Sequence, residues 1–121
     1  MKPTESQFTE DVSRGFRTGE IHQPLGMHWT KDEAVAQHFA NLGSPDSTVI
    51  YAKANPNNII KIGSDEHRTV QREHAVESEN SAEQESTIRP GSKVLVTGIH
   101  KTNDKGKTRL RTYRNGKEMR A

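Results

Sequence analysis

The chain of 121 residues has no cysteine and few aromatic residues, among them a single tryptophan. The absence of cysteine excludes disulfide bonds and zinc sites that need thiolate ligands. No run of about 18 apolar residues is present, and no signal-peptide pattern opens the chain. The six histidines lack the spacing of a metal site. We therefore expect a cytoplasmic protein without a membrane span and without a bound metal.

Large apolar residues are also scarce, because Leu, Ile, Val and Phe occupy only 21 of the 121 positions. A share below ~20% is typical of disordered chains, but disorder usually also needs a high net charge, which is only +2 here. The composition therefore predicts one small domain over residues 1–121 with a thin hydrophobic core. We expect a polar lead-in over residues 1–10 and a flexible loop over 63–82, with a marginal helix as the alternative for the loop.

The clearest local signal is a helix that the sequence predicts over residues 31–42. Thr30 is placed to act as its N-cap, and Glu33 stands three residues later, which is the spacing of a capping box. Apolar residues follow at helical intervals, and Gly43 provides a stop. Trp29 directly precedes the cap, so this segment is a candidate wall of a ligand site.

Most of the remaining chain has the composition of β-strands. Runs rich in β-branched and aromatic residues, separated by turn residues, predict short strands. The predicted strands cover residues 11–17, 27–30, 48–52, 59–62, 83–88, 93–97 and 108–113, with a hairpin turn at 103–106. One clear helix among these strands indicates an α+β fold with mainly antiparallel pairing.

Charge is distributed unevenly along the second half of the chain. Residues 65–85 contain seven acidic and two basic side chains, whereas residues 86–121 contain ten basic and two acidic side chains. A basic segment of this kind can bind nucleic acid or another polyanion, so residues 89–120 are a candidate nucleic-acid surface. The alternative interpretation is a solvated strand surface that offsets the acidic stretch.

Glu83 and Glu85 stand two residues apart in a predicted strand, so both carboxylates project from the same face. Like charges placed so closely repel each other unless a cationic ligand, or a substrate that develops positive charge, lies between them. Paired carboxylates also serve glycosidic-bond chemistry, whose transition state has oxocarbenium character. An exposed, solvated strand end is the alternative interpretation.

Arg14 and Gly15 form a second candidate site in the first predicted strand. A guanidinium offers a planar fork that suits phosphate, and a glycine lets a ligand approach the backbone. His28 and Trp29 form a third candidate, beside the predicted helix start. The alternatives are a surface arginine, a structural histidine and a tryptophan that belongs to the core.

Taken in order, these motifs resemble those of the NAD-dependent ADP-ribosyltransferases of the arginine, Ser-Thr-Ser, glutamate class. The residues that carry the resemblance, between positions 11 and 100, are Ser13-Arg14-Gly15, the triplet His28-Trp29-Thr30, the helix segment 35–40 with Phe39, and Glu83-Gln84-Glu85 followed by Pro90-Gly91. The segment around the triplet is similar to that of small phage and actinobacterial members of the family.

The resemblance implies a fold of two small, mainly antiparallel sheets packed around an NAD cleft, with one well-defined helix. It also implies that Arg14 holds the NAD phosphates or the adenylate ribose, and that Thr30 and its two preceding residues shape the nicotinamide pocket. The NAD-binding residues implied in this way are Arg14, Gly15, His28, Trp29, Thr30 and Phe39.

The implied activity is mono-ADP-ribosyl transfer from NAD to a macromolecular acceptor, with an arginine side chain of a protein as the expected acceptor. Glu85 is implied to be the catalytic glutamate, which bonds the nicotinamide ribose and stabilises positive charge as nicotinamide leaves. Glu83 is implied to orient the acceptor. For a phage-encoded toxin or effector, the expected place of action is the host cytoplasm.

The triplet departs from the family motif, because His28 and Trp29 stand where the family has two hydroxyl residues. Some of the usual hydroxyl bonds to the catalytic glutamate are therefore missing. This departure and the basic C-terminal third support a second hypothesis, a non-catalytic module of the same fold that binds nucleic acid or a partner protein. The catalytic hypothesis requires Arg14, Thr30 and Glu85 to converge on one cleft, whereas the non-catalytic hypothesis does not.

Overall fold

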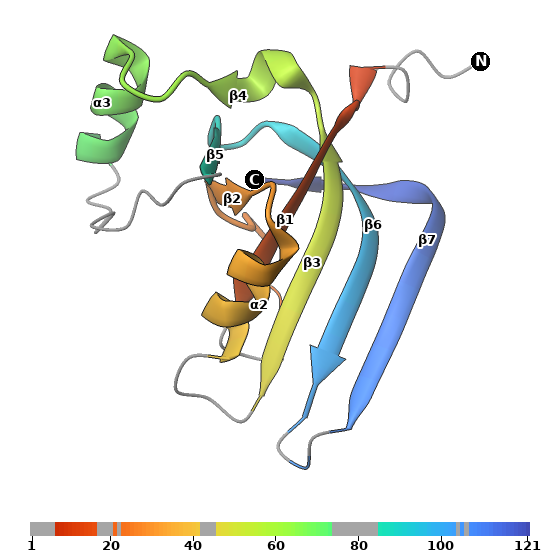
Figure 1. The fold of residues 1–121 in the computed structure, drawn as a ribbon. Helices are drawn as coiled ribbons and strands as arrows, with labels where there is room; N and C mark the ends of the chain where they lie inside the picture. Colours follow the sequence, from red (N-terminus) through yellow and green to blue (C-terminus); the bar gives the residue numbers. More distant parts are fainter. Residues whose placement is uncertain are drawn as a thin grey trace.

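The computed structural model describes residues 7–16, 21, 23–41, 46–73, 85–103, 105 and 107–121. Its elements are β1 (Glu10–Phe16), β2 (His28–Thr30), α2 (Glu33–Asn41), β3 (Ser47–Ala54), a 3-10 turn (Pro56–Asn58), β4 (Ile59–Ile60), α3 (Asp65–Glu73), β5 (Glu85–Ile88), β6 (Lys93–Thr102) and β7 (Thr108–Arg120). The strand order is β4-β5-β2-β1-β3-β6-β7, and every pairing between described strands is antiparallel (Figure 1). The predicted α+β fold with mainly antiparallel strands is confirmed.

The seven strands belong to one hydrogen-bonded sheet, so the expectation of two separate sheets is wrong. β1 pairs with β3 along its whole length, but it pairs with β2 only through Ser13 and Thr30. The long strands β1, β3, β6 and β7 lie side by side, and the short strands β2, β4 and β5 gather at one end (Figure 1). A single backbone pair therefore decides whether the short strands continue the sheet, and residue composition does not specify that pair.

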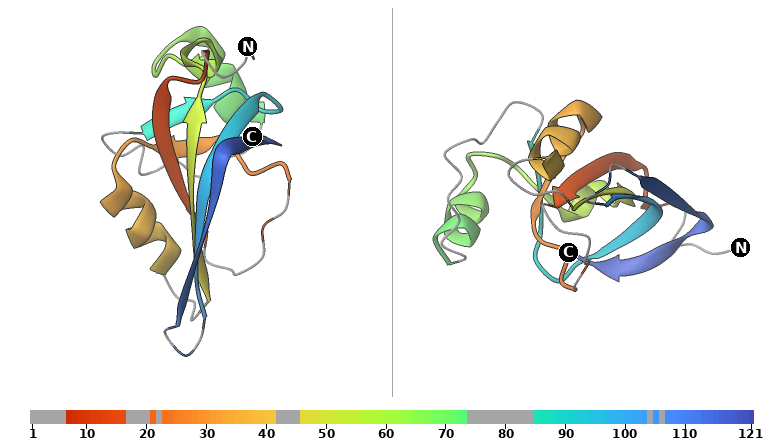
Figure 2. Two further views of the ribbon diagram at one scale, coloured as in Figure 1. Left: turned by 90° about the vertical axis from the view of Figure 1, so that its right-hand side faces the viewer. Right: turned by 90° about the horizontal axis from the view of Figure 1, so that it is seen from below.

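The two faces of the long strands carry different parts of the core, because successive residues of a strand point to opposite faces. On one face Val12 and Ile50 belong to the main hydrophobic cluster, together with Trp29 from β2. On the other face Val49 packs with Ala36 of α2 in a smaller cluster. α2 lies along one side of the long strands (Figure 2). The sheet thus has a main core face and an α2 face.

The predicted helix is present as α2, but its N-cap differs from the prediction. The Asp32 carboxylate accepts a hydrogen bond of 2.9 Å from the backbone N–H of Ala34, so Asp32 is the N-cap. The hydroxyl of Thr30 accepts the N–H of Asp32 at 3.0 Å and holds the turn before the helix. The capping box of Thr30 and Glu33 is therefore wrong, because the helix begins two residues later than predicted, at Glu33. The predicted stop at Gly43 lies outside the described residues.

Part of the segment 63–82, expected to be a flexible loop, forms the helix α3. Ser64 caps this helix, since its hydroxyl accepts the N–H of His67 at 3.1 Å. Glu66 accepts two hydrogen bonds from the guanidinium of Arg89, at 2.7 and 3.0 Å, and this pair links α3 to the end of β5. The sequence does not clearly predict α3, because this helix has no stripe of apolar residues. No described helix has the length and apolar character needed to cross a membrane.

β7 runs to Arg120 and is longer than the strand predicted over 108–113. Its second half pairs with β6 again after an irregularity, with Lys117 opposite Val96. Gly116 lies in this irregular stretch with a φ of 78°, and a Cβ there would lie 2.3 Å from Cγ of Leu95. A glycine is therefore required where the two strands cross closely. The charged composition of this half gives no strand signal.

Candidate functional site

Arg14 carries a largely buried guanidinium in the middle of the sheet. It lies opposite Ile50 in the antiparallel register, so its side chain belongs to the main core face. Nη1 donates a hydrogen bond to the carbonyl of His28, and the guanidinium carbon lies 5.0 Å from the centroid of the Phe16 ring. Nε is buried without a hydrogen-bond partner, and burial lowers the pKa of the group. A buried cation that no described carboxylate neutralises is suited to bind an anion.

Two glycines have distinct packing roles near Arg14. Gly26 has a φ of 112°, and a Cβ there would lie 2.7 Å from the guanidinium carbon of Arg14. Gly26 therefore leaves the space that the guanidinium occupies. A Cβ at Gly15 would lie 1.9 Å from the carbonyl oxygen of Ala36, so Gly15 allows α2 to pack directly on β1. Helix packing alone accounts for Gly15, and its role in NAD binding stays a prediction.

The segment before α2 fixes the position of Arg14 through the core. Trp29 is only 2% exposed, and its indole N–H donates a hydrogen bond of 2.8 Å to the carbonyl of Gly26. The tryptophan thus belongs to the core, which was the alternative interpretation of the sequence. His28 is half-buried, and its main chain is the part that accepts the hydrogen bond from Arg14. Arg14 and His28 are therefore joined by a direct hydrogen bond, and Trp29 is linked to Arg14 through Gly26, which both residues approach.

Thr30 connects the strands of Arg14 and Glu85. Its backbone pairs with Ser13 on one side and with Glu85 on the other, so the three residues lie abreast on β1, β2 and β5. Adjacent strands are about 4.8 Å apart, which places the Glu85 backbone two strand spacings from β1. The side chain of Glu85 and the whole of Glu83 lie outside what the structure describes. Thr30 shares the face of its partner Ser13, which neighbours Arg14 on β1 and points the other way, so the Thr30 side chain does not meet the Arg14 guanidinium. The convergence of the carboxylates of Glu83 and Glu85 with Arg14 stays a prediction.

Phe39 is not placed near Arg14. It lies on α2, which covers the face opposite to the Arg14 side chain, and it is 39% exposed. Its described ring contact is an edge-on approach to His38, with 6.0 Å between the ring centroids. The helical spacing of Phe39 correctly places it on α2, but at a position on the helix that is partly exposed to solvent.

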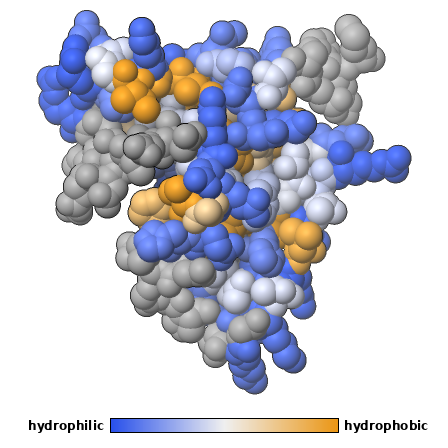
Figure 3. Space-filling model, viewed as in Figure 1, coloured by the Kyte–Doolittle hydropathy of each residue, from blue (hydrophilic) through white to orange (hydrophobic). Residues whose placement is uncertain are grey.

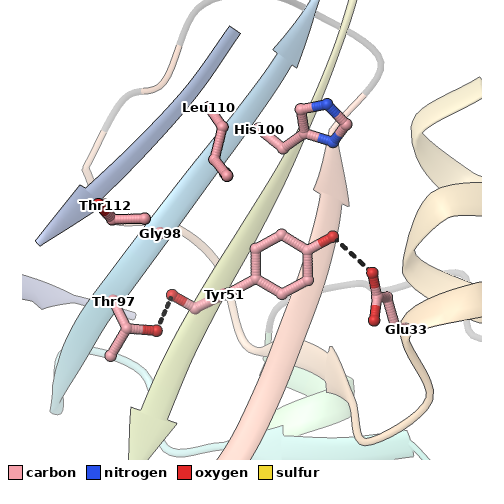
Figure 4. Close-up of a pocket in the computed structure, with 7 residues that line it drawn as sticks. All are labelled: Glu33, Tyr51, Thr97, Gly98, His100, Leu110 and Thr112. Atoms are coloured by element: carbon pink, nitrogen blue, oxygen red, sulfur yellow. Dashed lines mark hydrogen bonds between the residues drawn. The ribbon is translucent and has the colours of Figure 1, made fainter. Parts of the chain in front are cut away.

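Sequence inspection missed a pocket on the α2 face of the sheet. This α2-face pocket has a volume of about 400 Å³ (Figure 4). Its lining residues are Glu33, Tyr51, Thr97, Gly98, His100, Leu110 and Thr112. The Tyr51 hydroxyl donates a hydrogen bond of 2.9 Å to Oε1 of Glu33. Burial, followed by the hydrogen bond and charge of Glu33, raises the pKa of Tyr51 to about 12.

The pocket was missed because its residues carry no joint sequence signal. The sequence predicts Tyr51 in a buried strand and Glu33 in a capping box. Gly98 falls beyond the end of the predicted strand 93–97, whereas β6 continues to Thr102. The register of three strands brings these residues together, and spacing along the chain does not reveal that register.

The end of the β6–β7 ribbon carries three exposed basic residues on the main core face of the sheet. Lys101 lies opposite Arg109, and Arg111 lies opposite the core residue Ile99. We name Lys101, Arg109 and Arg111 the cationic hairpin; no ion pair joins them to a described carboxylate. The guanidinium carbon of Arg111 lies 5.9 Å from the centroid of the Tyr113 ring. This group combines positive charge with an aromatic ring.

The beginning of the predicted basic stretch 89–120 is neutralised, unlike its middle. Arg89 pairs with Glu66, and Lys93 lies 3.6 Å from a carboxylate oxygen of Glu118. On the face seen in Figure 3, hydrophilic residues cover most of the surface and hydrophobic residues form separate patches. A polyanion would therefore meet unpaired charge at the cationic hairpin and paired charge at the start of the stretch.

Comparisons with protein-family models, with curated proteins and with solved structures give no match for this chain. Within the described ranges, no group of three or more histidines, aspartates and glutamates is arranged to hold a metal ion. The function is therefore inferred from the motifs of the chain and the geometry of its sites.

Proposed function

We propose that this chain is an NAD-dependent mono-ADP-ribosyltransferase with an ADP-ribosyltransferase-like fold, as the resemblance of its motifs implies. The observation that carries the proposal is the state of Arg14, whose guanidinium is buried against the His28 carbonyl with its Nε unbonded. An unneutralised buried charge is costly, and a pyrophosphate supplies both negative charge and hydrogen-bond acceptors. Arg14 would hold the phosphates of NAD in this proposal.

The proposed reaction breaks the bond between the nicotinamide nitrogen and C1 of its ribose. Nicotinamide leaves with the bonding electron pair, and positive charge develops on the ribose. The Glu85 carboxylate would stabilise this charge, and Glu83 would orient the acceptor. A guanidinium nitrogen of an acceptor arginine then forms the new bond to C1 and releases a proton to solvent.

The support that the fold gives to this assignment is limited to the backbone: the pairing of β2 with β5 places the backbone of Glu85 near β1. Thr30 and Glu85 are partners in that pairing, and Thr30 also pairs with β1, which carries Arg14. A phosphate held by Arg14 on β1 and a ribose near Glu85 on β5 would therefore have only β2 between them in one sheet. Preorganised charge of this kind lowers a barrier without costly rearrangement.

Transfer of labelled ADP-ribose from NAD to proteins of a cell extract tests the proposal. We expect the purified chain to label a protein acceptor and the Glu85→Gln variant to lose about a hundredfold or more of this activity. Glu118→Gln is the matched control, because Glu118 is a half-exposed carboxylate paired with Lys93. Equal labelling by the Glu85→Gln variant, or no labelling by the unaltered chain, would contradict the proposal.

A second candidate function, binding of single-stranded nucleic acid without catalysis, is favoured by the cationic hairpin. Its three basic side chains are exposed and share one face, and Tyr113 lies beside Arg111. Cations contact phosphates, and aromatic rings stack on bases.

The salt dependence of binding to a labelled single-stranded oligonucleotide tests the second candidate. Each neutralised phosphate contributes about −0.7 to the slope of log affinity against log salt concentration. Arg109→Gln and Arg111→Gln should each reduce the slope by about that amount. Arg72→Gln, an exposed arginine on α3, should leave it unchanged. Negligible affinity at low ionic strength, or equal slopes for all variants, argues against this function.

A further inference from the structure

We propose that the α2-face pocket binds the side chain of an arginine from a partner protein. Tyr51, which lines the pocket, directly follows Ile50 in β3, and Ile50 shares its face with Arg14. The pocket and the guanidinium of Arg14 therefore lie on opposite faces of the sheet. The arginine site is distinct from the proposed NAD site and does not rest on the proposed enzymatic function.

The register of the strands creates the hollow. Tyr51, Gly98 and Thr112 lie abreast on β3, β6 and β7, and the neighbouring row on the same face contains His100 and Leu110. Gly98 has no side chain, so the row between Tyr51 and Thr112 is left open. A Cβ at Gly98 would lie 3.7 Å from Cδ2 of Tyr51, at ordinary contact distance, so backbone packing does not require the glycine here. The missing side chain leaves room for a ligand against the tyrosine ring.

The walls of the pocket have the dimensions and polarity of a ligand site. Leu110 forms an apolar wall although the residue is 63% exposed, and the ring of Tyr51 lies between it and α2 (Figure 4). A volume of about 400 Å³ is within the range of small-ligand pockets, roughly 300–1,000 Å³. Glu33 and Thr112 are exposed at the rim, so the pocket is accessible to a side chain that approaches from solvent.

The charge of the pocket selects a cation. Among the described residues that line it, Glu33 alone is acidic, and the Tyr51 hydroxyl holds one carboxylate oxygen at 2.9 Å. Glu33 is an exposed residue, so its carboxylate is accessible to a ligand from solvent. The face of a tyrosine ring is also electrostatically negative, so it attracts a cation stacked on it. An anionic ligand would be repelled by Glu33.

A guanidinium satisfies these features better than an ammonium does. It is planar and weakly hydrated, so it stacks on an aromatic ring while its N–H groups donate to a carboxylate. The aliphatic part of an arginine side chain would pack along Leu110, because long charged side chains bury their stems against apolar surface. The occupant that we infer is therefore an arginine side chain, whose charge is complementary to Glu33 and to the ring of Tyr51.

Amide chemical shifts of the isotope-labelled chain, titrated with N-acetyl-arginine amide, test the proposal. We expect saturable shifts at Tyr51, Gly98 and Leu110. N-acetyl-citrulline amide, which has nearly the same shape without the charge, should cause none of them. Equal shifts with the citrulline probe, or arginine shifts confined to other parts of the chain, would overturn the proposal. Shifts at these three residues with adenosine monophosphate in place of arginine would also overturn it.

Two variants locate the binding site. Glu33→Gln keeps an oxygen for the Tyr51 hydroxyl but removes the charge, so arginine affinity should fall about tenfold. Gly98→Val should fill the hollow and abolish the shifts, and the same spectra report whether its fold is intact. Glu118→Gln, at a carboxylate paired with Lys93 outside the pocket, should bind as tightly as the unaltered chain. Unchanged affinity in Glu33→Gln refutes the assignment even if Gly98→Val does not fold.

Discussion

Arg14 donates a hydrogen bond from Nη1 to the main-chain carbonyl of His28, which joins β1 to β2 where those strands share a single backbone pair. The position of this carbonyl depends on the core, because the adjacent Trp29 is buried and its indole bonds to Gly26. The guanidinium is therefore held in one place by backbone and core contacts instead of by a described carboxylate. A preorganised cation of this kind is ready to accept an anionic ligand.

Replacement of Arg14 by methionine should separate stability from NAD binding. Loss of an unneutralised buried charge offsets loss of the hydrogen bond to His28, so the free energy of unfolding should stay within about 1 kcal/mol of its original value. NAD binding, measured by calorimetry, should be lost in the same variant. Destabilisation by more than about 3 kcal/mol in urea titrations would show that Arg14 is a structural residue.

Gly15→Ala should destabilise the chain by about 3 kcal/mol, because the new methyl group would collide with the backbone of α2. Gly98→Ala is the matched control, since its Cβ would make only ordinary contacts. The control should change the free energy of unfolding by less than about 1 kcal/mol. Thermal or urea unfolding measures both values. Similar effects of the two substitutions would show that α2 does not pack on Gly15 in the described way.

Asp32→Ala should lower the free energy of unfolding by about 1 kcal/mol, because the variant leaves the N–H of Ala34 without its cap. Asp32→Asn should retain most of the stability, since asparagine is an equally good N-cap. Urea unfolding of the two variants provides the comparison. If the asparagine variant loses as much stability as the alanine variant, the capping role of Asp32 is wrong.

The phenol of Tyr51 should ionise late in an alkaline titration. Burial and the neighbouring Glu33 raise its pKa to about 12 from the ordinary value of 10.0, because both disfavour the phenolate. The protonated phenol therefore contributes to the stability of the folded state, and this contribution is fully present below pH 10 and is lost as the pH rises through about 12. Ultraviolet absorbance of tyrosinate, compared between the chain and Tyr51→Phe, measures this ionisation.

Glu33→Gln provides the control for that titration. Removal of the carboxylate charge should lower the pKa of Tyr51, while burial should keep it above the ordinary value. Two results would contradict the described contact with Glu33. One is ionisation of Tyr51 near pH 10 in the unaltered chain, and the other is an equal pKa of Tyr51 in the unaltered chain and in the variant.

Local signals in the sequence were sufficient for several elements. α2 follows from apolar residues at helical spacing, and its start is misplaced only because both Thr30 and Asp32 are good caps. The strand around Tyr51 follows from its β-branched residues, and the strand around Arg14 was expected from Val12 and Phe16. Arg14 contacts the main chain of His28, whereas the expected joint role of Arg14 and the segment 28–30 in NAD binding stays a prediction.

Features that depend on long-range register could not be predicted. The single pair of Ser13 with Thr30 joins the short strands to the long ones, and composition does not encode such a pair. The α2-face pocket needs Tyr51, Gly98 and Leu110 from three strands, although none of them forms a motif along the chain. α3 is polar on most sides, and its link to β5 through Arg89 is a tertiary contact.

Titration of the isotope-labelled chain with NAD tests the central claim most directly, because amide shifts report where NAD binds. The proposed function predicts saturable shifts at Arg14, His28, Thr30 and Glu85, and their loss in the Arg14→Met variant. Absence of any shift, or shifts confined to the cationic hairpin or to the α2-face pocket, would contradict the claim that Arg14 anchors NAD on this sheet.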